Sequence, residues 1–200
     1  MKVLLICGPY GSGTSAVAGM LANLGATGLG PYWQTNDPRT PNSHELIALK
    51  DMLLELVSED TSLLKPDAPV DRALADFKTL LAARVPDGRP VFLKHPAAAL
   101  ILPQFCRVFD TQLIYVLRSM QEIEATRQRR NWRVGGAQAA QIIYSRMFEY
   151  LVNGSTPTMI LRYRNLIDQP LDHARSLAAY ANLPRDERAL QHAASIIVPR

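Results

Sequence analysis

The chain has little cysteine, no long apolar run and no block of like charges. Its two cysteines, Cys7 and Cys106, form no C-x-x-C pair, the pattern that would indicate a zinc site or a redox centre. The apolar start is too short for a signal peptide, and no stretch approaches the roughly 18 apolar residues of a membrane helix. We therefore expect a cytoplasmic protein with reduced cysteines, no metal and no membrane span.

Charge and size exclude further classes. The net charge is +4, but the Lys and Arg residues form no polybasic tail and accompany no nucleic-acid-binding motif, so we do not expect a nucleic-acid partner. With 200 residues, 48% of them hydrophobic, the chain suits one globular domain over residues 1–200 and is too short for two comfortable ones. The sequence indicates no oligomeric state.

The strongest local pattern lies at the N-terminus. Residues 3–7 are a short run of apolar, mostly branched side chains, typical of a buried parallel strand. Gly8, Gly11 and Gly13 interrupt it, and a helical pattern starts at Thr14. A glycine-rich turn between a strand and a helix surrounds an anion with backbone N–H groups and the positive end of the helix dipole. The pattern therefore predicts a phosphate-binding loop.

This loop follows the P-loop spacing G-x-x-x-x-G-K-[ST] but lacks its lysine. Gly8, Gly13 and Ser15 match the pattern, whereas Thr14 stands at the lysine position. Since that lysine reaches the β- and γ-phosphates of a nucleoside triphosphate, its absence argues against an ordinary ATPase, GTPase or kinase. A small-molecule kinase with a degenerate loop and a non-catalytic nucleotide-binding domain stay open as alternatives.

Strands alternate with helices along the rest of the chain. Further strands are expected at residues 90–94, 113–117 and 158–162. Helices are expected from residue 14, over about 42–58, 70–85, 120–132 and 137–152, from 168–170 onward and from near 185. A short helix or turn, broken at Pro103, is expected over 97–109. This order predicts an α/β fold, a single-domain three-layer sandwich whose mostly parallel sheet of four to five strands is flanked by helices.

Basic residues follow the expected strands. In an open α/β sheet, ligands bind outside the carboxyl ends of the strands. That rule brings the N-terminal loop together with Lys94 and His95, with Arg118, and with residues 162–164, which contain two arginines. Three of these four places carry cations, so the sequence predicts a ligand with more than one anionic group.

Three segments resemble PAPS-dependent sulfotransferases, a P-loop-related family with bacterial members. Gly-Ser-Gly-Thr-Ser at 11–15 resembles their phosphosulfate-binding loop, with Gly11 where the family usually has Lys or Arg. Residues 113–126 resemble the 3′-phosphate motif, in which Arg118 matches the arginine and Thr126 keeps the hydroxyl of the serine. Residues 92–103 resemble a K-D-P-R…L-P segment, with His95 in place of the acid and Ala97 in place of the arginine. Residues 163–166 more loosely resemble a Y-E-D-L segment.

The resemblance implies transfer of a sulfuryl group from 3′-phosphoadenosine 5′-phosphosulfate (PAPS) to a hydroxyl or amine of a small-molecule or carbohydrate acceptor. The product would be adenosine 3′,5′-bisphosphate, and no metal is implied. The residues implied to hold the donor are Gly11, Ser12, Gly13, Thr14, Ser15, Arg118 and Thr126. His95 would take the acceptor proton, and Lys94 would stabilise the transferred group. Because adjacent strand residues point to opposite faces, which of the two reaches the site stays open, and His95 is equally well a packed structural residue.

Residues 25–88 have no counterpart in the resemblance and are expected to form a helical insert on the acceptor side. Tyr32 and Trp33 either line an acceptor pocket or pin their loop to the core. His44 falls in the first turn of an expected helix, where a solvated or capping role is favoured. Arg127, Arg129, Arg130 and Arg133 either form a solvated helix face or contact an anionic ligand.

Overall fold

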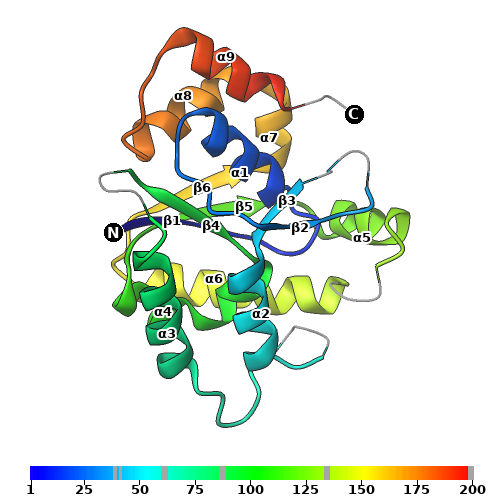
Figure 1. Ribbon diagram of the computed structural model, residues 1–200. Coiled ribbons are helices and arrows are strands. Elements are labelled where there is room, and N and C mark those ends of the chain that lie inside the picture. Colours follow the sequence, from blue (N-terminus) through cyan, green and yellow to red (C-terminus); the bar gives the residue numbers. More distant parts are fainter. Residues whose placement is uncertain (38–39, 41, 60–62, 86–88, 133–135, 198–200) are drawn as a thin grey trace.

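The structure, a computed structural model, describes residues 1–37, 40, 42–59, 63–85, 89–132 and 136–197. Four parallel strands form its central sheet in the spatial order β4 (Val91–Lys94), β1 (Lys2–Cys7), β5 (Asp110–Leu117) and β6 (Thr158–Arg162) (Figure 1). Leu5 of β1 pairs with Leu93 on one side and Leu113 on the other. The predicted parallel sheet is confirmed, and β5 starts three residues earlier than expected.

Helices cover both faces of the sheet, which explains why its inner strands are apolar throughout. Val3, Leu5 and Cys7 pack toward one helical layer, and Leu4 and Ile6 pack toward the other. The first layer contains α2 (Ile47–Leu56), α3 (Val70–Ala82), η1 (Pro96–Ile101), α4 (Leu102–Val108) and α6 (Ala137–Asn153). The second contains α1 (Thr14–Asn23), α7 (Tyr163–Asp168), α8 (Pro170–Tyr180) and α9 (Glu187–Ser195). The molecule is thus the expected three-layer α/β sandwich.

The segment around residue 42 departs from the expected helix. Asn42–Leu46 is a strand, β3, paired antiparallel with β2 (Tyr32–Gln34), and α2 begins only at Ile47. His44 has a φ of 56°, which no right-handed helix accommodates. The Asn42 and Ser43 side chains accept the N–H groups of His44 and Glu45 and so close local turns instead of capping a helix.

The remaining helices follow the sequence more closely. Ser119 caps α5 (Met120–Arg129) by accepting the N–H of Glu122, as its capping box predicts. The helix ends at Arg129, slightly before the expected end, and the short helix α7 was not expected.

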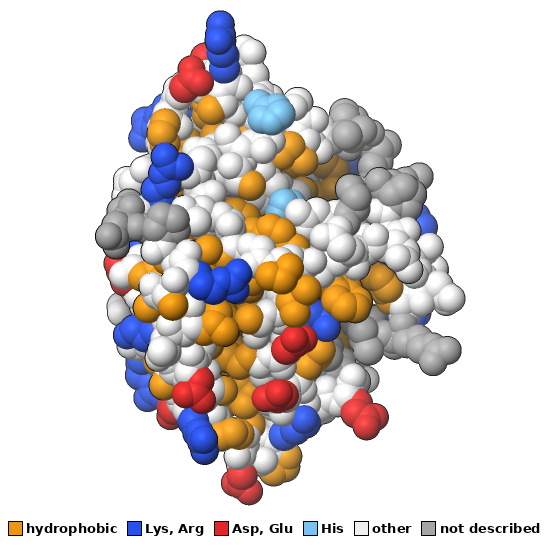
Figure 2. All heavy atoms as spheres, in the orientation of Figure 1, with side chains coloured by type: hydrophobic (Ala, Val, Ile, Leu, Met, Phe, Trp, Pro, Cys, Tyr) orange, Lys and Arg blue, Asp and Glu red, His pale blue; other side chains and the backbone are white. Residues whose placement is uncertain are grey.

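Apolar side chains gather in the middle of the face shown in Figure 2, while many charged ones lie toward its rim. Within the described ranges, no helix has the length and apolar character needed to cross a membrane.

Candidate functional site

The loop between β1 and α1 leaves the N-terminus of α1 open. Gly11 and Gly13 have φ angles of 83° and 102°, in the left-handed region that glycine tolerates best. The carbonyl of Gly13 accepts the N–H groups of Ala16 and Val17, at 3.0 and 3.3 Å. In the described part of the chain no side chain caps α1, whereas Ser119 caps α5. The first turn of α1 therefore offers backbone donors to an anion.

Side chains packed against the loop explain its glycines. A Cβ on Gly13 would lie 2.2 Å from the ring of Tyr163, and a Cβ on Gly11 would lie 3.2 Å from the Thr126 methyl group. Together with its positive φ, this contact means that a Lys or Arg at position 11 would be strained. Glycine therefore suits this backbone conformation and this contact with Thr126 better than a cationic residue would.

Arg118 and Thr126 lie together at the loop. Nη1 of Arg118 donates to the Gly11 carbonyl at 2.7 Å and to Oγ1 of Thr126 at 3.0 Å. The guanidinium stacks on the ring of Tyr163, 4.7 Å from its centroid. The Tyr144 hydroxyl accepts the backbone N–H of Arg118 and donates to its carbonyl, both at 2.8 Å. The arginine is therefore held from its backbone and its side chain before any ligand arrives.

Lys94 brings a positive charge to the start of α1 from another strand. Its Nζ lies 2.6 Å from Oε1 of Glu45 and 3.2 Å from both Oγ of Ser15 and the Ser43 carbonyl. Burial alone would raise the pKa of Glu45, but Lys94, with further help from His95, lowers it below its ordinary value. Glu45 is therefore an ionised, nearly buried carboxylate beside the loop. Sequence reasoning missed it because it was assigned to a helix.

His95 ends β4 and is almost completely buried. Its Nδ1 accepts the N–H of Ala97 at 3.2 Å, so the neutral ring carries its proton on Nε2. Burial lowers the pKa of His95 to about 4 despite the opposing effect of Glu45. At neutral pH His95 is uncharged, and its basic nitrogen is already bonded to the backbone.

This buried histidine predicts an acid-sensitive fold. The ordinary pKa of 6.5 applies to the unfolded chain, so between pH 6.5 and about 4 the unfolded state binds the extra proton. The free energy of unfolding should therefore fall by about 1.4 kcal/mol per pH unit on acidification from this residue alone. His44, with its pKa also lowered to about 4 by burial, acts in the same direction. Urea unfolding at pH 7, 6 and 5 measures the slope.

His95→Asn is the matched variant for this measurement, because asparagine can still accept the Ala97 N–H but does not titrate. The variant should lose stability less steeply than the native chain over the same range. An identical slope in both proteins would show that His95 does not cause the acid sensitivity.

One cavity of about 1410 Å³ joins these groups. The expected site residues that line it are Gly11, Gly13, Thr14, Ser15, Lys94, His95, Arg118 and Thr126. Ser12 instead lies fully buried inside the loop, where a Cβ on Gly8 would be 2.5 Å from its hydroxyl. Lys94 and His95 both reach the cavity, because the chain turns at His95 into η1.

The expected cations after β6 do not reach this cavity. Arg162 is exposed, and Arg164 pairs with Asp168 at 3.2 Å on the surface. Tyr163, between them, lines the cavity and carries the stacked Arg118. The prediction of a third cationic place was wrong, since the chain enters α7 directly after β6 and points its aromatic ring inward.

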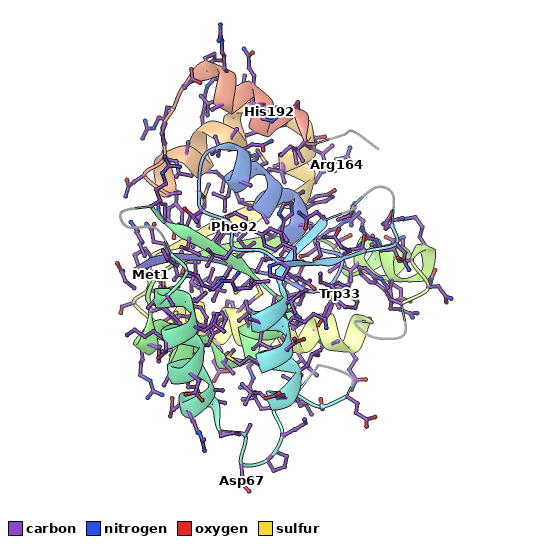
Figure 3. All side chains as sticks on the ribbon, in the orientation of Figure 1. Met1, Trp33, Asp67, Phe92, Arg164 and His192 are labelled. Carbon is purple, nitrogen blue, oxygen red and sulfur yellow. The ribbon has the colours of Figure 1, made fainter. Side chains whose placement is uncertain are left out.

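The sequence left two roles open for the aromatic residues of β2, and each residue fits a different one. Trp33, labelled in Figure 3, is half-exposed and lines the cavity. Lys50 also lines it, and its Nζ lies 4.3 Å from the centroid of the Trp33 ring. Tyr32 stacks on Phe92, with ring centroids 6.4 Å apart, and so pins the hairpin to the core. His44 packs against both Tyr32 and Phe92, so its expected solvated or capping role was wrong.

The arginines at the end of α5 and just after it form two different kinds of ion pair. Arg127 forms a 2.6 Å ion pair with Glu124 along the helix. Arg129 and Arg130 turn toward the cavity and pair with Asp37, which precedes β3. Arg133 lies outside the described residues.

Comparison with known proteins identifies the fold. No family model and no curated protein matches this sequence. The sulfotransferase STF1 from Mycobacterium tuberculosis superposes with a TM-score of 0.64 and 14% identity over 96% of this chain and 70% of that chain. The sulfotransferase STF9 from Mycobacterium avium gives a TM-score of 0.58 and 15% identity over 96% of this chain and 66% of that chain. The chain thus spans about two thirds of the length of these structures, and it has the P-loop-related fold of the sulfotransferases.

Proposed function

We propose that this protein transfers a sulfuryl group from PAPS to a hydroxyl or amine of a small-molecule or carbohydrate acceptor. The observation that carries the proposal is that Arg118 donates both to the Gly11 carbonyl of the glycine loop and to the Thr126 hydroxyl. We take this pair as a second anion-binding position beside the loop, in the same cavity. PAPS has phosphates at both ends of its ribose, whereas ATP has a single phosphate chain. The shared fold supports the same assignment.

The donor would lie across the two positions. Backbone N–H groups of Gly11 and of residues 13–15 would hold the 5′-phosphosulfate, and Arg118 and Thr126 would hold the 3′-phosphate. The N–H of Ser12 is instead bonded to the Pro9 carbonyl at 3.0 Å. The acceptor oxygen or nitrogen would attack sulfur in line as the bond from sulfur to the bridging oxygen breaks, releasing adenosine 3′,5′-bisphosphate. Lys94 lies where it would stabilise the charge on that oxygen or on the sulfuryl group. These side chains and the loop supply the positive charge without a metal.

Two side chains in the cavity are candidates for the base that takes the proton from the acceptor substrate. His95, the group expected from the sequence, would first have to release the Ala97 N–H from its Nδ1. Glu45 is ionised and lies beside Lys94 in the same cavity. Geometry therefore favours Glu45 as the base, with the Nε2–H of His95 as a hydrogen-bond donor.

Acceptor choice is assigned to the segment of residues 25–88. This segment supplies the half-exposed Trp33, with Lys50 and Leu54, to the wall of the cavity. An aromatic ring beside a cation suits a flat or ring-shaped acceptor that also carries polar groups.

Calorimetric titration tests the donor assignment. We expect adenosine 3′,5′-bisphosphate to bind without metal, at least about tenfold more tightly than adenosine 5′-monophosphate, because the 3′-phosphate adds charge-assisted hydrogen bonds. ADP, and ATP with Mg²⁺, serve as comparison ligands. Preference for ATP with Mg²⁺ would instead make the protein a small-molecule kinase. Bisphosphate binding without turnover across an acceptor panel would make it a non-catalytic nucleotide-binding domain.

A further inference from the structure

Besides Arg118, two neighbouring arginines, Arg129 and Arg130, face the cavity at the end of α5. The nearest contacts of Arg129 and Arg130 with Oδ2 of Asp37 are 3.2 and 2.5 Å. Nη2 of Arg130 also donates to Thr40 at 2.6 Å, and its guanidinium lies 4.6 Å from the centroid of the Trp132 ring. All of these residues line the cavity that contains the glycine loop.

The burial of this cluster sets it apart from an ordinary surface ion pair. The side chains of Asp37 and Arg130 are only 9% and 12% exposed, so their interaction is screened far less than one in open water. Holding one oxyanion between two guanidinium groups is also how arginines bind phosphate or sulfate. Asp37 therefore supplies a carboxylate at a place suited to a ligand's oxyanion.

The cluster is continuous with the proposed donor site. Arg130 is the C-cap residue of α5, and its backbone N–H donates to the Thr126 carbonyl at 3.0 Å, so the two residues follow one another on one side of the helix end. Thr126 in turn contacts Arg118 at 3.0 Å. A run of cationic and hydroxyl groups thus extends along α5 from the glycine loop toward the β2–β3 connection.

We propose that Arg129 and Arg130 form an anion subsite for a phosphate or sulfate group, which the Asp37 carboxylate occupies until the ligand displaces it. The anion would be the 3′-phosphate of the donor, which this pair would then share with Arg118 and Thr126, or an acidic group on the acceptor. The inference rests on the proposed function only where it names the molecule that carries this anion. The opposing view, in which Asp37 merely ties the β2–β3 connection to α5, predicts unchanged or weaker anion binding when this carboxylate is neutralised.

Removing the competing carboxylate distinguishes the two views. Asp37→Asn should tighten binding of the anion by about three- to tenfold, because the subsite is then available for more of the time. Arg130→Gln should weaken the same binding. Glu149→Gln and Arg146→Gln are matched controls: they neutralise the partners of an exposed 2.9 Å ion pair on α6 and should change nothing. Circular dichroism confirms folding of every variant.

The probes are adenosine 3′,5′-bisphosphate, adenosine 5′-monophosphate and inorganic sulfate, each followed by calorimetry. A gain in Asp37→Asn with the bisphosphate but not with the monophosphate assigns the subsite to the donor's 3′-phosphate. A gain with sulfate added to bisphosphate-saturated protein assigns it to an acidic acceptor. If Asp37→Asn leaves binding of all three probes unchanged or weaker, Asp37 is a structural tie and the proposal is wrong. Should no variant bind the bisphosphate, the proposed function fails, while sulfate alone still tests the subsite.

Discussion

Arg118→Ala should weaken binding of adenosine 3′,5′-bisphosphate by about 30- to 1000-fold, the equivalent of roughly 2–4 kcal/mol. The native guanidinium is already aligned by Gly11, Thr126 and the Tyr163 ring, so little ordering opposes its bonds to a phosphate. Alanine removes both the charge and the paired donors. Calorimetry against the native protein measures the loss.

Two variants show how specific this loss is. Arg118→Lys keeps the charge but not the planar fork, so it should recover only part of the affinity. Arg146→Ala removes an arginine from the exposed face of α6 and should leave affinity unchanged. Native affinity in Arg118→Ala would contradict the role of this residue and, with it, the assignment of a donor that has a 3′-phosphate.

Lys94→Met should lower sulfuryl transfer by about two to three orders of magnitude, because it removes a charge preorganised beside the loop. It should also destabilise the fold by about 3–5 kcal/mol, since Glu45 would be left as a nearly buried carboxylate without its closest cation. Urea unfolding and turnover are to be measured on the same preparations.

The double variant Lys94→Met/Glu45→Gln separates the two effects. Neutralising Glu45 removes the unpaired charge, so most of the lost stability should return. Turnover should stay low, because the cation and the favoured base are both absent. If turnover returned together with stability, Lys94 would have only a structural role and Glu45 would not be the base, so the proposed mechanism would lose both groups.

The fold and much of the candidate site follow from local sequence. The buried strand, glycine turn and helix at residues 3–24 need only apolar runs, left-handed glycines and helical spacing, all of which act within a few residues. Arg118 was likewise identifiable because it ends an expected strand, whereas Thr126 was identified from the resemblance to the sulfotransferase 3′-phosphate motif. The capping box at Ser119 was also correct, because it too acts within a few residues.

Features that depend on contacts between residues far apart in the chain could not be predicted from the sequence. Glu45 belongs to a strand rather than a helix because Ser43 and His44 make long-range contacts, the former with Trp33 and Ser15 and the latter with Tyr32 and Phe92. Its pairing with Lys94 joins residues 49 positions apart, which no local pattern encodes. The ion pair between Arg130 and Asp37 also joins residues far apart in the chain.

Local patterns in the sequence therefore predict the sheet, the glycine loop and the residues at the strand ends. Only the folded chain shows which of these residues meet and with what charge. In it, Nζ of Lys94 lies 3.2 Å from Oγ of Ser15, beside the loop. The basic nitrogen of His95 is bonded to the Ala97 N–H, and Arg162 and Arg164 face solvent. The physical reason is that backbone preference acts between neighbours in the chain. Side-chain electrostatics act between neighbours in space, and folding alone brings those together.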